Sequence, residues 1–375
     1  MEKPTTGEIT PLVENSIDFH CHGVGRFDFT EIAALDLQEI ESILARRKQR
    51  TVLTLYLPKP NFKGFINLIE TFNTGRKMGK FKYLLGFGLE GPLLASHGGT
   101  PETGIWMPEL QHWKELAACG EKGLIYVILS PDALLAHGSN FSSCATSSPS
   151  IAWITETLLE GGVLPAPGHF TKVDPEASAK LLQTMFDIVA VSKLGSTITD
   201  HLINDMPHNF KHAWRTPSEK MKRNQEIKLL NLESWNLDVL EEKVGVVPAV
   251  MIRNARKGYV KICQNFDGEH VDLVIVKKLV EIIGAENIIM MTDSIESKRL
   301  AGRQLHMVED STLLYQDQGI VAAGSQNVAH QIKSMFSIGL NSNQVKLISG
   351  TVPANIIQQR NRYFTEYHHA QANCI

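Results

Sequence analysis

The chain has few cysteines and no pattern that would pair them. Its 375 residues include five, none in a CxxC pair: Cys21, Cys119, Cys144, Cys263 and Cys374. An odd number of scattered cysteines argues against a disulfide framework and favours a reducing compartment. The opening stretch, MEKPTTGEITPLVENS, does not have the pattern of a signal peptide, so we expect a cytoplasmic protein.

Long apolar runs and an excess of one charge are also missing. No run approaches the length that spans a membrane. The formal net charge is −3, whereas a nucleic-acid-binding protein usually carries a basic surface. Hydrophobic residues make up 43% of the chain, enough to fill a sizeable core. We therefore expect a globular protein that binds neither membranes nor nucleic acids.

Eight apolar segments alternate with longer amphipathic segments. The apolar segments predict strands at 16–20, 51–57, 83–90, 124–129, 162–166, 196–201, 259–266 and 287–293. Asp174 followed by Pro175 is typical of the start of a helix. The alternation predicts an α/β fold, either a (β/α)8 barrel or a doubly wound open sheet. No repeat or linker divides the chain, so we expect one domain over 1–375 with its barrel core at about 15–360.

Histidines and carboxylates follow several of the predicted strands. In the stretch ENSIDFHCHGVG, His20 and His22 would point to the same face of a strand. Other strand ends carry Glu90, His169, His201, His270 and Asp293. Each has an ordinary alternative, such as a helix cap, a loop histidine or a buried hydrogen-bonded side chain. A barrel gathers these ends in one ring and an open sheet does not, so their positions favour the barrel.

Imidazoles and carboxylates together are ligands of zinc or ferrous iron. An ion held by them lowers the pKa of a water molecule and polarises a carbonyl group. A carboxylate such as Asp293 can take the proton of that water and pass it to a leaving group. The set therefore predicts a metal site with hydrolytic chemistry.

The order and the amino-acid sequences of the motifs resemble those of the N-acetylglucosamine-6-phosphate deacetylases of the amidohydrolase superfamily. The motifs run from about residue 17 to 357 and are DFHCHGVG, GLEGP, PGHFT, DHLINDM, FDGEHV, MTDS and GTVPANII. The resemblance implies metal-dependent hydrolysis of an N-acetyl amide on N-acetylglucosamine 6-phosphate or a close relative, giving the free amine and acetate. It also implies a divalent metal, one or two ions of zinc or else iron, and a homodimer.

The resemblance further implies the ligands of each ion. Glu90, His169 and His201 would hold the principal ion. His20 and His22 would complete a second position, with Glu90 as the bridge.

It also implies three roles around the substrate. Asp293 would be a metal ligand and the general base, and then the general acid that protonates the departing amine. His270 would line the substrate site, and Asn204 would contact the sugar or its phosphate.

The chain departs from the family pattern in four places. Little sequence precedes the first motif or follows the last, so we expect the usual accessory β-sandwich to be absent or vestigial. A substrate-contacting histidine after the Glu-Gly-Pro motif is missing, and His97 is the nearest substitute. The family's Asn-Ala pair is Asn204-Asp205 here, which places a carboxylate beside the expected phosphate. The phosphate-binding arginine has no counterpart, and nearby candidates are Lys211, His212 and Arg215.

These departures lead to the hypothesis that the substrate is a relative of N-acetylglucosamine 6-phosphate without a phosphate in the same place. Two other functions stay open: another C–N hydrolase of the same superfamily, and a catalytically silent sugar-binding barrel. We expect the tryptophans to pack in the core or at an interface rather than stack on sugars, and the basic run at 219–228 to be a solvated helix face.

Overall fold

The eight predicted strands are present in the computed structural model, which describes residues 6–135, 149–210 and 217–372. They are β1 (Ile17–Cys21), β4 (Arg50–Leu55), β5 (Leu84–Glu90), β6 (Leu124–Leu129), β7 (Leu164–Pro167), β8 (Thr197–His201), β9 (Val260–Asn265) and β10 (Ile288–Met291). The predicted strands are confirmed to within two residues at each end.

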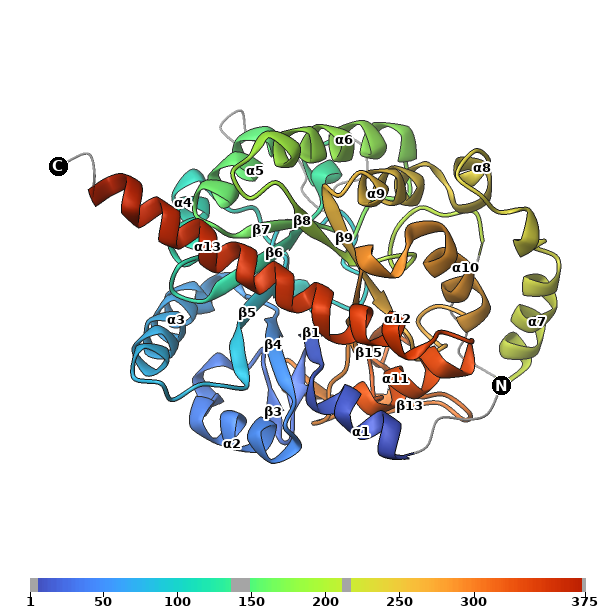
Figure 1. Ribbon diagram of the computed structural model, residues 1–375, viewed down its shortest axis with the longest axis horizontal. Coiled ribbons are helices and arrows are strands. Elements are labelled where there is room, and N and C mark those ends of the chain that lie inside the picture. Colours follow the sequence, from blue (N-terminus) through green and yellow to red (C-terminus); the bar gives the residue numbers. More distant parts are fainter. Residues whose placement is uncertain (1–5, 136–148, 211–216, 373–375) are drawn as a thin grey trace.

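The strands form two parallel sheets whose edges meet (Figure 1). One has the order β1-β4-β5-β6-β7 and the other β8-β9-β10. At one junction Thr197 Oγ1 donates to the Pro165 carbonyl at 2.8 Å. At the other, the Asp293 amide donates to the His20 carbonyl at 2.9 Å. The parallel α/β class is thus confirmed, and the curled sheets bring the first strand beside the last.

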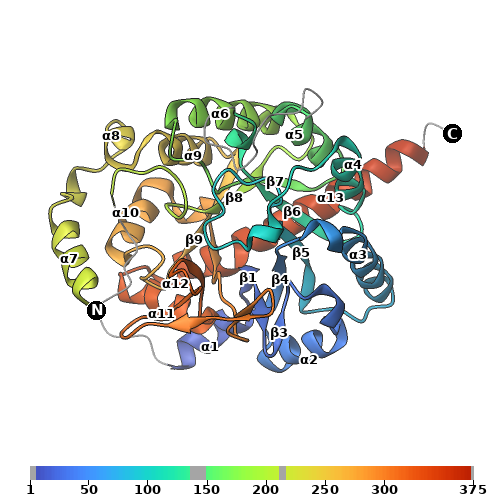
Figure 2. The same cartoon turned by 180° about the vertical axis from the view of Figure 1, so that it is seen from behind.

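Helices surround the strands (Figures 1 and 2). They are α1 (Thr6–Glu14), α2 (Leu37–Arg47), α3 (Phe62–Lys77), α4 (Leu110–Ala118), α5 (Ile151–Glu160), α6 (Pro175–Val191), α7 (Pro217–Lys228), α8 (Leu240–Val244), α9 (Val246–Arg256), α10 (Leu273–Ile283), α11 (Val328–Ser337), α12 (Ser342–Lys346) and α13 (Val352–Ala372). The predicted start of α6 is confirmed, because the Asp174 side chain accepts a hydrogen bond from the Ala177 amide. Among the described helices, none is long and apolar enough to cross a membrane.

The long helix α13 crosses the amino-terminal ends of the strands and projects past them (Figure 1). Its Arg360 is 5% exposed and donates to three backbone carbonyls, those of Gly120, Leu124 and Gly162. These carbonyls lie just before or at the start of β6 and β7. The hydrogen bonds of this one buried guanidinium therefore hold α13 against this end of the sheet.

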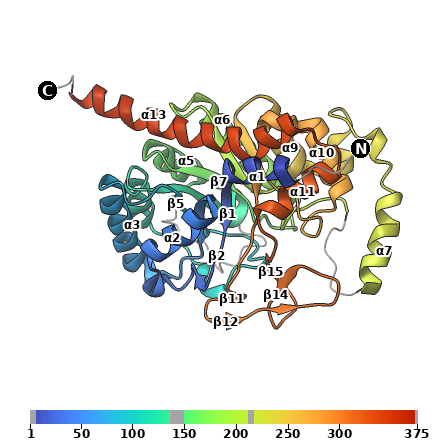
Figure 3. The ribbon, with the colours of Figure 1, turned by 60° about the horizontal axis from the view of Figure 1, so that its bottom comes forward.

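Small antiparallel sheets occupy the opposite side of the molecule from α13 (Figure 3). They contain β2 (Gly23–Val24), β3 (Phe27–Asp28), β11 (Arg299–Leu300), β12 (Arg303–Gln304), β13 (His306–Met307), β14 (Leu313–Tyr315) and β15 (Val321–Gly324). The insertion between β10 and α11 was not predicted. The expected loss of the accessory β-sandwich stays a prediction.

The predictions for the tryptophans and for the basic run at 219–228 have different outcomes. Trp113, Trp235 and Trp106 are buried, as predicted for core residues. The basic run forms most of α7, but Arg223 is only 3% exposed and lies 2.5 Å from the Asp272 carboxylate. The prediction of a wholly solvated helix face is therefore wrong at Arg223, because this guanidinium pairs with the partly buried carboxylate of Asp272.

Candidate metal centre

The carboxyl-terminal ends of the strands hold a buried cluster of histidines and carboxylates. Each of its six predicted members is at most 5% exposed: His20 in β1, His22 just after it, Glu90 at the end of β5, His169 after β7, His201 at the end of β8, and Asp293 after β10. The fold thus brings together side chains from five strands that are far apart in the sequence.

Glu90 lies between the histidines of the cluster. Its Oε1 is 2.8 Å from Nε2 of His169. Its Oε2 is 3.0 Å from Nε2 of His20 and 3.2 Å from Nε2 of His22. One carboxylate therefore faces two groups of imidazoles, which is the geometry of a bridging ligand.

Asp293 contacts the His20–His22 side of the cluster. Its Oδ1 lies 3.2 Å from Nε2 of His22 and 3.8 Å from Nε2 of His20. Its Oδ2 lies 3.3 Å from Nε2 of His270. Asp293 does not cap a following helix, the alternative considered for it, because β10 leads into the antiparallel insertion.

Two of the histidines are oriented through their second ring nitrogen. Nδ1 of His22 lies 3.2 Å from the Thr54 carbonyl, and Nδ1 of His169 lies 2.9 Å from Oδ2 of Asp205. Such contacts fix the ring and leave Nε2 for a metal. Both Nε2 atoms do face Glu90.

Asp200 is part of the cluster and was not predicted. Its carboxylate is fully buried, with Oδ2 at 3.2 Å from Nε2 of His169 and 3.3 Å from Nε2 of His201. In a regular strand, adjacent residues point to opposite faces, so Asp200 and His201 would not share a site. The pairing of β8 with β9 shifts register between Ile198 and His201, and this bulge places both side chains in the cluster. The adjacent Asp-His pair in TITDHL was the available sequence signal.

The pKa values show how strongly the cluster attracts positive charge. Burial raises the pKa of Glu90, but hydrogen bonds from His169, His20 and His22 hold it well below its usual value. Burial lowers the pKa of His22, but its contacts with Asp293 and Glu90 raise it to about 10. Protons on the imidazoles thus compensate buried carboxylates, a task that a divalent cation performs in a metal site.

The donor set fits one or two divalent ions. Two groups of side chains each have ligand atoms within 4.8 Å of one another: Glu90, His169, Asp200 and His201, and His20, His22 and Asp293. Apart from their contacts with one another and with the histidines of the cluster, several buried polar atoms here have no hydrogen-bond partner among the described residues, including Glu90 Oε2, His169 Nε2 and both oxygens of Asp200. Buried polar groups normally have a partner, so these atoms are available to an ion.

A cavity of about 480 Å³ opens over the cluster. Asn204 and His270 line it, and residues 319–322, which lead into β15, form one wall. His270 is 3% exposed rather than an exposed turn residue. Burial lowers its pKa, but Asp267, 2.5 Å from its Nδ1, raises that pKa to about 9.

The other predicted substrate residues lie elsewhere or are engaged. Asp205 lines the cavity, but its carboxylate accepts from Ser96 Oγ at 2.9 Å and contacts His169. His97 lines a neighbouring cavity of about 280 Å³, not the one over the cluster. Arg215 lies outside the described residues, as do Lys211 and His212.

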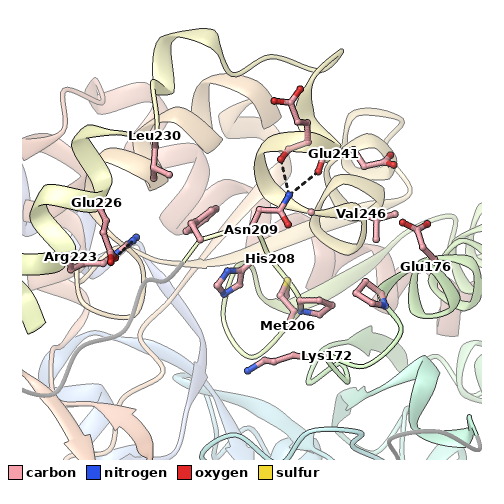
Figure 4. A pocket seen from close by; sticks show the side chains of 15 residues that line it. Lys172, Glu176, Met206, His208, Asn209, Arg223, Glu226, Leu230, Glu241 and Val246 are labelled. Carbon is pink, nitrogen blue, oxygen red and sulfur yellow. Dashed lines mark hydrogen bonds and ion pairs between the residues drawn. The ribbon is translucent and has the colours of Figure 1, made fainter.

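The cavity is bordered by a larger and more open cleft of about 1130 Å³ (Figure 4). The two share Lys172 and His208 in their linings. Asn209 holds one wall of the cleft in place, because its amide donates to the Glu241 and Glu242 carbonyls at the start of α8. The open cleft therefore lies directly beside the cavity over the cluster.

Comparison with known proteins identifies the fold through solved structures. No protein-family model and no curated protein sequence matches the chain. The N-acetylglucosamine-6-phosphate deacetylase from Pasteurella multocida is 15% identical, with a TM-score of 0.64, over 92% of this chain and 77% of that one. The enzyme from Thermotoga maritima is also 15% identical, with a TM-score of 0.62, over 92% of this chain and 78% of that one.

A third similar structure is the deacetylase from Mycobacterium smegmatis, in a mutant form in complex with N-acetyl-D-glucosamine-6-phosphate. It is 17% identical, with a TM-score of 0.63, over 92% of this chain and 77% of that one. The chain therefore has a fold of the amidohydrolase type. In particular, it has the fold of the N-acetylglucosamine-6-phosphate deacetylases, which confirms at the level of fold the resemblance seen in the sequence motifs.

Proposed function

We propose that the chain is a metal-dependent amidohydrolase that removes the acetyl group from an amino sugar, N-acetylglucosamine 6-phosphate or a close relative. The observation that carries this proposal is the buried cluster bridged by Glu90 beneath a cavity at the strand ends. We further infer that the strands form a closed (β/α)8 barrel in a single domain over 1–375, and that the enzyme works in the cytoplasm as a homodimer. The order of motifs along the chain supports the barrel, the scattered cysteines favour the cytoplasm, and the homodimer is what the family resemblance implies.

The centre would hold one or two divalent ions, zinc or iron. Glu90, His169 and His201 would bind one, and His20 and His22 the other, with Glu90 shared. An ion bound there supplies Lewis acidity, which polarises the amide carbonyl and makes an attacking water more acidic.

Asp293 is the group placed to move the proton. Burial raises its pKa, but contacts with His22 and His270 keep that pKa below its usual value, so it is a carboxylate at neutral pH. A carboxylate lining the cavity can accept the proton of an attacking water and then deliver it to the amine nitrogen as the C–N bond breaks. His270 would remain beside Asp293 and hold its second oxygen.

The remaining residues of the cavity would bind the sugar. Asn204 offers an amide, and the wall at residues 319–322 excludes water from one side. Asp205 does not present an unpaired charge to the substrate, because His169, Ser96 and Lys172 surround its carboxylate. The expected repulsion of a phosphate by this residue is thereby reduced, and the position of any phosphate stays open to test.

Acetate release tests the proposal. The purified protein, loaded with zinc or with iron, is given N-acetylglucosamine 6-phosphate and N-acetylglucosamine in parallel. Release of acetate from either supports deacetylation, and a preference for the plain sugar supports a substrate without the 6-phosphate. Metal binding without acetate release from either sugar contradicts the proposed substrate class and directs the search to cyclic amides and other N-acyl compounds.

A further inference from the structure

We propose that Asp200 binds the metal directly, as a second carboxylate beside Glu90, and that the centre therefore favours a five- or six-coordinate ion such as Fe²⁺ or Mn²⁺ over four-coordinate Zn²⁺. The inference rests on the proposed function only in requiring that the cluster holds a metal. The expected ligands named from the sequence do not include Asp200.

The position of Asp200 is that of a ligand. Its Oδ2 lies within 3.3 Å of Nε2 of both His169 and His201, the nitrogens that also face the bridging carboxylate or the cluster interior. Its carboxylate belongs to a group with Glu90, His169 and His201 in which the ligand atoms all lie within 4.8 Å of one another. An ion placed among these nitrogens and Glu90 would meet Asp200 as well.

Alternative partners do not account for this carboxylate. Nδ1 of His20 is 3.6 Å from Oδ1 of Asp200, which is too long for a hydrogen bond. Apart from the imidazoles of His169 and His201, which lie 3.2 and 3.3 Å from Oδ2, neither oxygen has a hydrogen-bond partner among the described residues, although the side chain is fully buried. An ionised group in that environment is strongly unfavourable unless a cation pairs with it.

The backbone is adapted to hold Asp200 at this point. The bulge in β8 turns its side chain into the cluster together with His201. The neighbouring Gly168 leaves the space, since a Cβ at Gly168 would lie 2.5 Å from Cβ of Asp200. Thr199 Oγ1 donates to the Asp200 carbonyl at 2.6 Å and accepts from the Cys263 amide at 3.1 Å, which stabilises the bulge.

The charges and the number of ligands lead to the choice of ion. Glu90, Asp200 and Asp293 place three carboxylates in one buried cluster, which suits two divalent cations better than one. Catalytic zinc usually has three protein ligands and one open position. Here Glu90 and Asp200 with two imidazoles make four protein ligands, so an open position requires a coordination number of five or more, as Fe²⁺ and Mn²⁺ prefer.

Metal titration of the full chain tests the inference without any substrate. Metal-free protein, prepared with a chelator, is titrated with Mn²⁺, Zn²⁺ and Co²⁺ in the wild type, Asp200→Asn and Asp200→Ala. Asp28→Asn is the matched control, because Asp28 is a buried carboxylate that accepts from the Thr30 and Gly302 amides instead of facing the cluster. We expect both Asp200 variants to lose about 100-fold or more in Mn²⁺ affinity and less in Zn²⁺ affinity, with the control unchanged.

The visible spectrum of bound Co²⁺ separates a ligand from a structural residue. A five- or six-coordinate Co²⁺ absorbs weakly and a four-coordinate one strongly, so we expect weak absorption in the wild type and stronger absorption in Asp200→Ala. Strong absorption in the wild type overturns the inference even if neither variant folds. Equal affinities and spectra in wild type and variants overturn it as well.

The outcomes also distinguish this inference from the proposed function. If the wild type binds metal and the Asp200 variants do not differ from it, the role of Asp200 is wrong and deacetylation is unaffected. If the titrations agree with the expectation but no acetate is released from either sugar, the proposed reaction is wrong and the metal ligand stands.

Discussion

The partly buried Asp205 and the buried His169 form a pair, with Oδ2 of the carboxylate 2.9 Å from Nδ1 of the ring. Burial raises the pKa of Asp205, but its contact with His169 brings that pKa down to about 2. The carboxylate therefore stays ionised and holds the ring with Nε2 toward Glu90. A residue that the sequence placed beside a phosphate is thus better explained as support for a metal ligand.

Replacing Asp205 should weaken metal binding. We expect Asp205→Ala to lower metal affinity by about 10- to 100-fold, because the ring of His169 loses the group that orients it. Competition with a chromophoric chelator measures the change. Ser96→Ala is the control, since it removes a hydrogen bond to the same carboxylate but leaves the contact with His169. Equal losses in the two variants would contradict a role through His169.

Replacing Asp293 should slow the reaction. In Asp293→Asn we expect acetate release to fall by about 10²- to 10⁴-fold, because the amide cannot accept the proton of the attacking water. Metal content is determined on the same sample by elemental analysis. A retained metal with a normal rate would show that Asp293 is not the base.

Removing the metal should destabilise the protein. An ion held by the proposed centre would bind the folded cluster and not the unfolded chain, so at about 1,000 times its dissociation constant it would add about 4 kcal/mol to the free energy of unfolding. We expect a chelator to lower the midpoint of thermal unfolding and added metal to restore it. A midpoint that is the same with chelator and with metal would be evidence against a bound ion.

Asp132 should make stability depend on pH. Burial is the main cause that raises its pKa, from 3.8 to about 6. The folded state therefore holds this proton more tightly than the unfolded chain, and the free energy of unfolding falls as the pH rises from about 4 to 6. A shift of this size corresponds to roughly 3 kcal/mol.

Asp132→Asn tests this assignment with little change in shape. One oxygen of Asp132 accepts from both the Thr171 amide and Ser178 Oγ, and an amide oxygen can take its place. We expect the variant to gain stability relative to the wild type between pH 4 and pH 7, measured by urea unfolding at each pH. A constant difference across that range would mean that Asp132 does not titrate there.

Arg360→Met should loosen the attachment of α13. The substitution keeps much of the side-chain length but leaves three buried carbonyls without their donor. The Gly120 carbonyl still accepts from the Gly123 amide, so two carbonyls are left unsatisfied. At about 1 kcal/mol or more for each, we expect a loss of at least about 2 kcal/mol in the free energy of unfolding. The exposed Arg362→Met on the same helix is the control and should change stability little.

The sequence predicts the strands and most of the centre well, because both depend on local patterns. Apolar runs mark the strands, and the polar residues that end them meet where parallel strands curl into a ring. The place of Asp200 in the cluster could not be predicted in this way, because Asp200 lies on a bulge. A bulge depends on pairing with a distant strand rather than on local pattern. The pairing of Asp205 with His169 is similar, since it joins the loops after β8 and β7. The β13–β15 insertion has strands of two to four residues, too short for a periodic signal.

The contact between β1 and β10 has a consequence for how the protein is made. His20 and His22 lie in and just after β1, while Asp293 follows the last strand of the ring, so an ion between them would close the segment that holds all eight strands into one loop. A chain still emerging from the ribosome has its first two histidines long before their partner exists. The contact of Asp293 with the second metal position would therefore form only after β10 has been synthesised and docked, so an ion held by all three side chains would report that the ring of strands is closed.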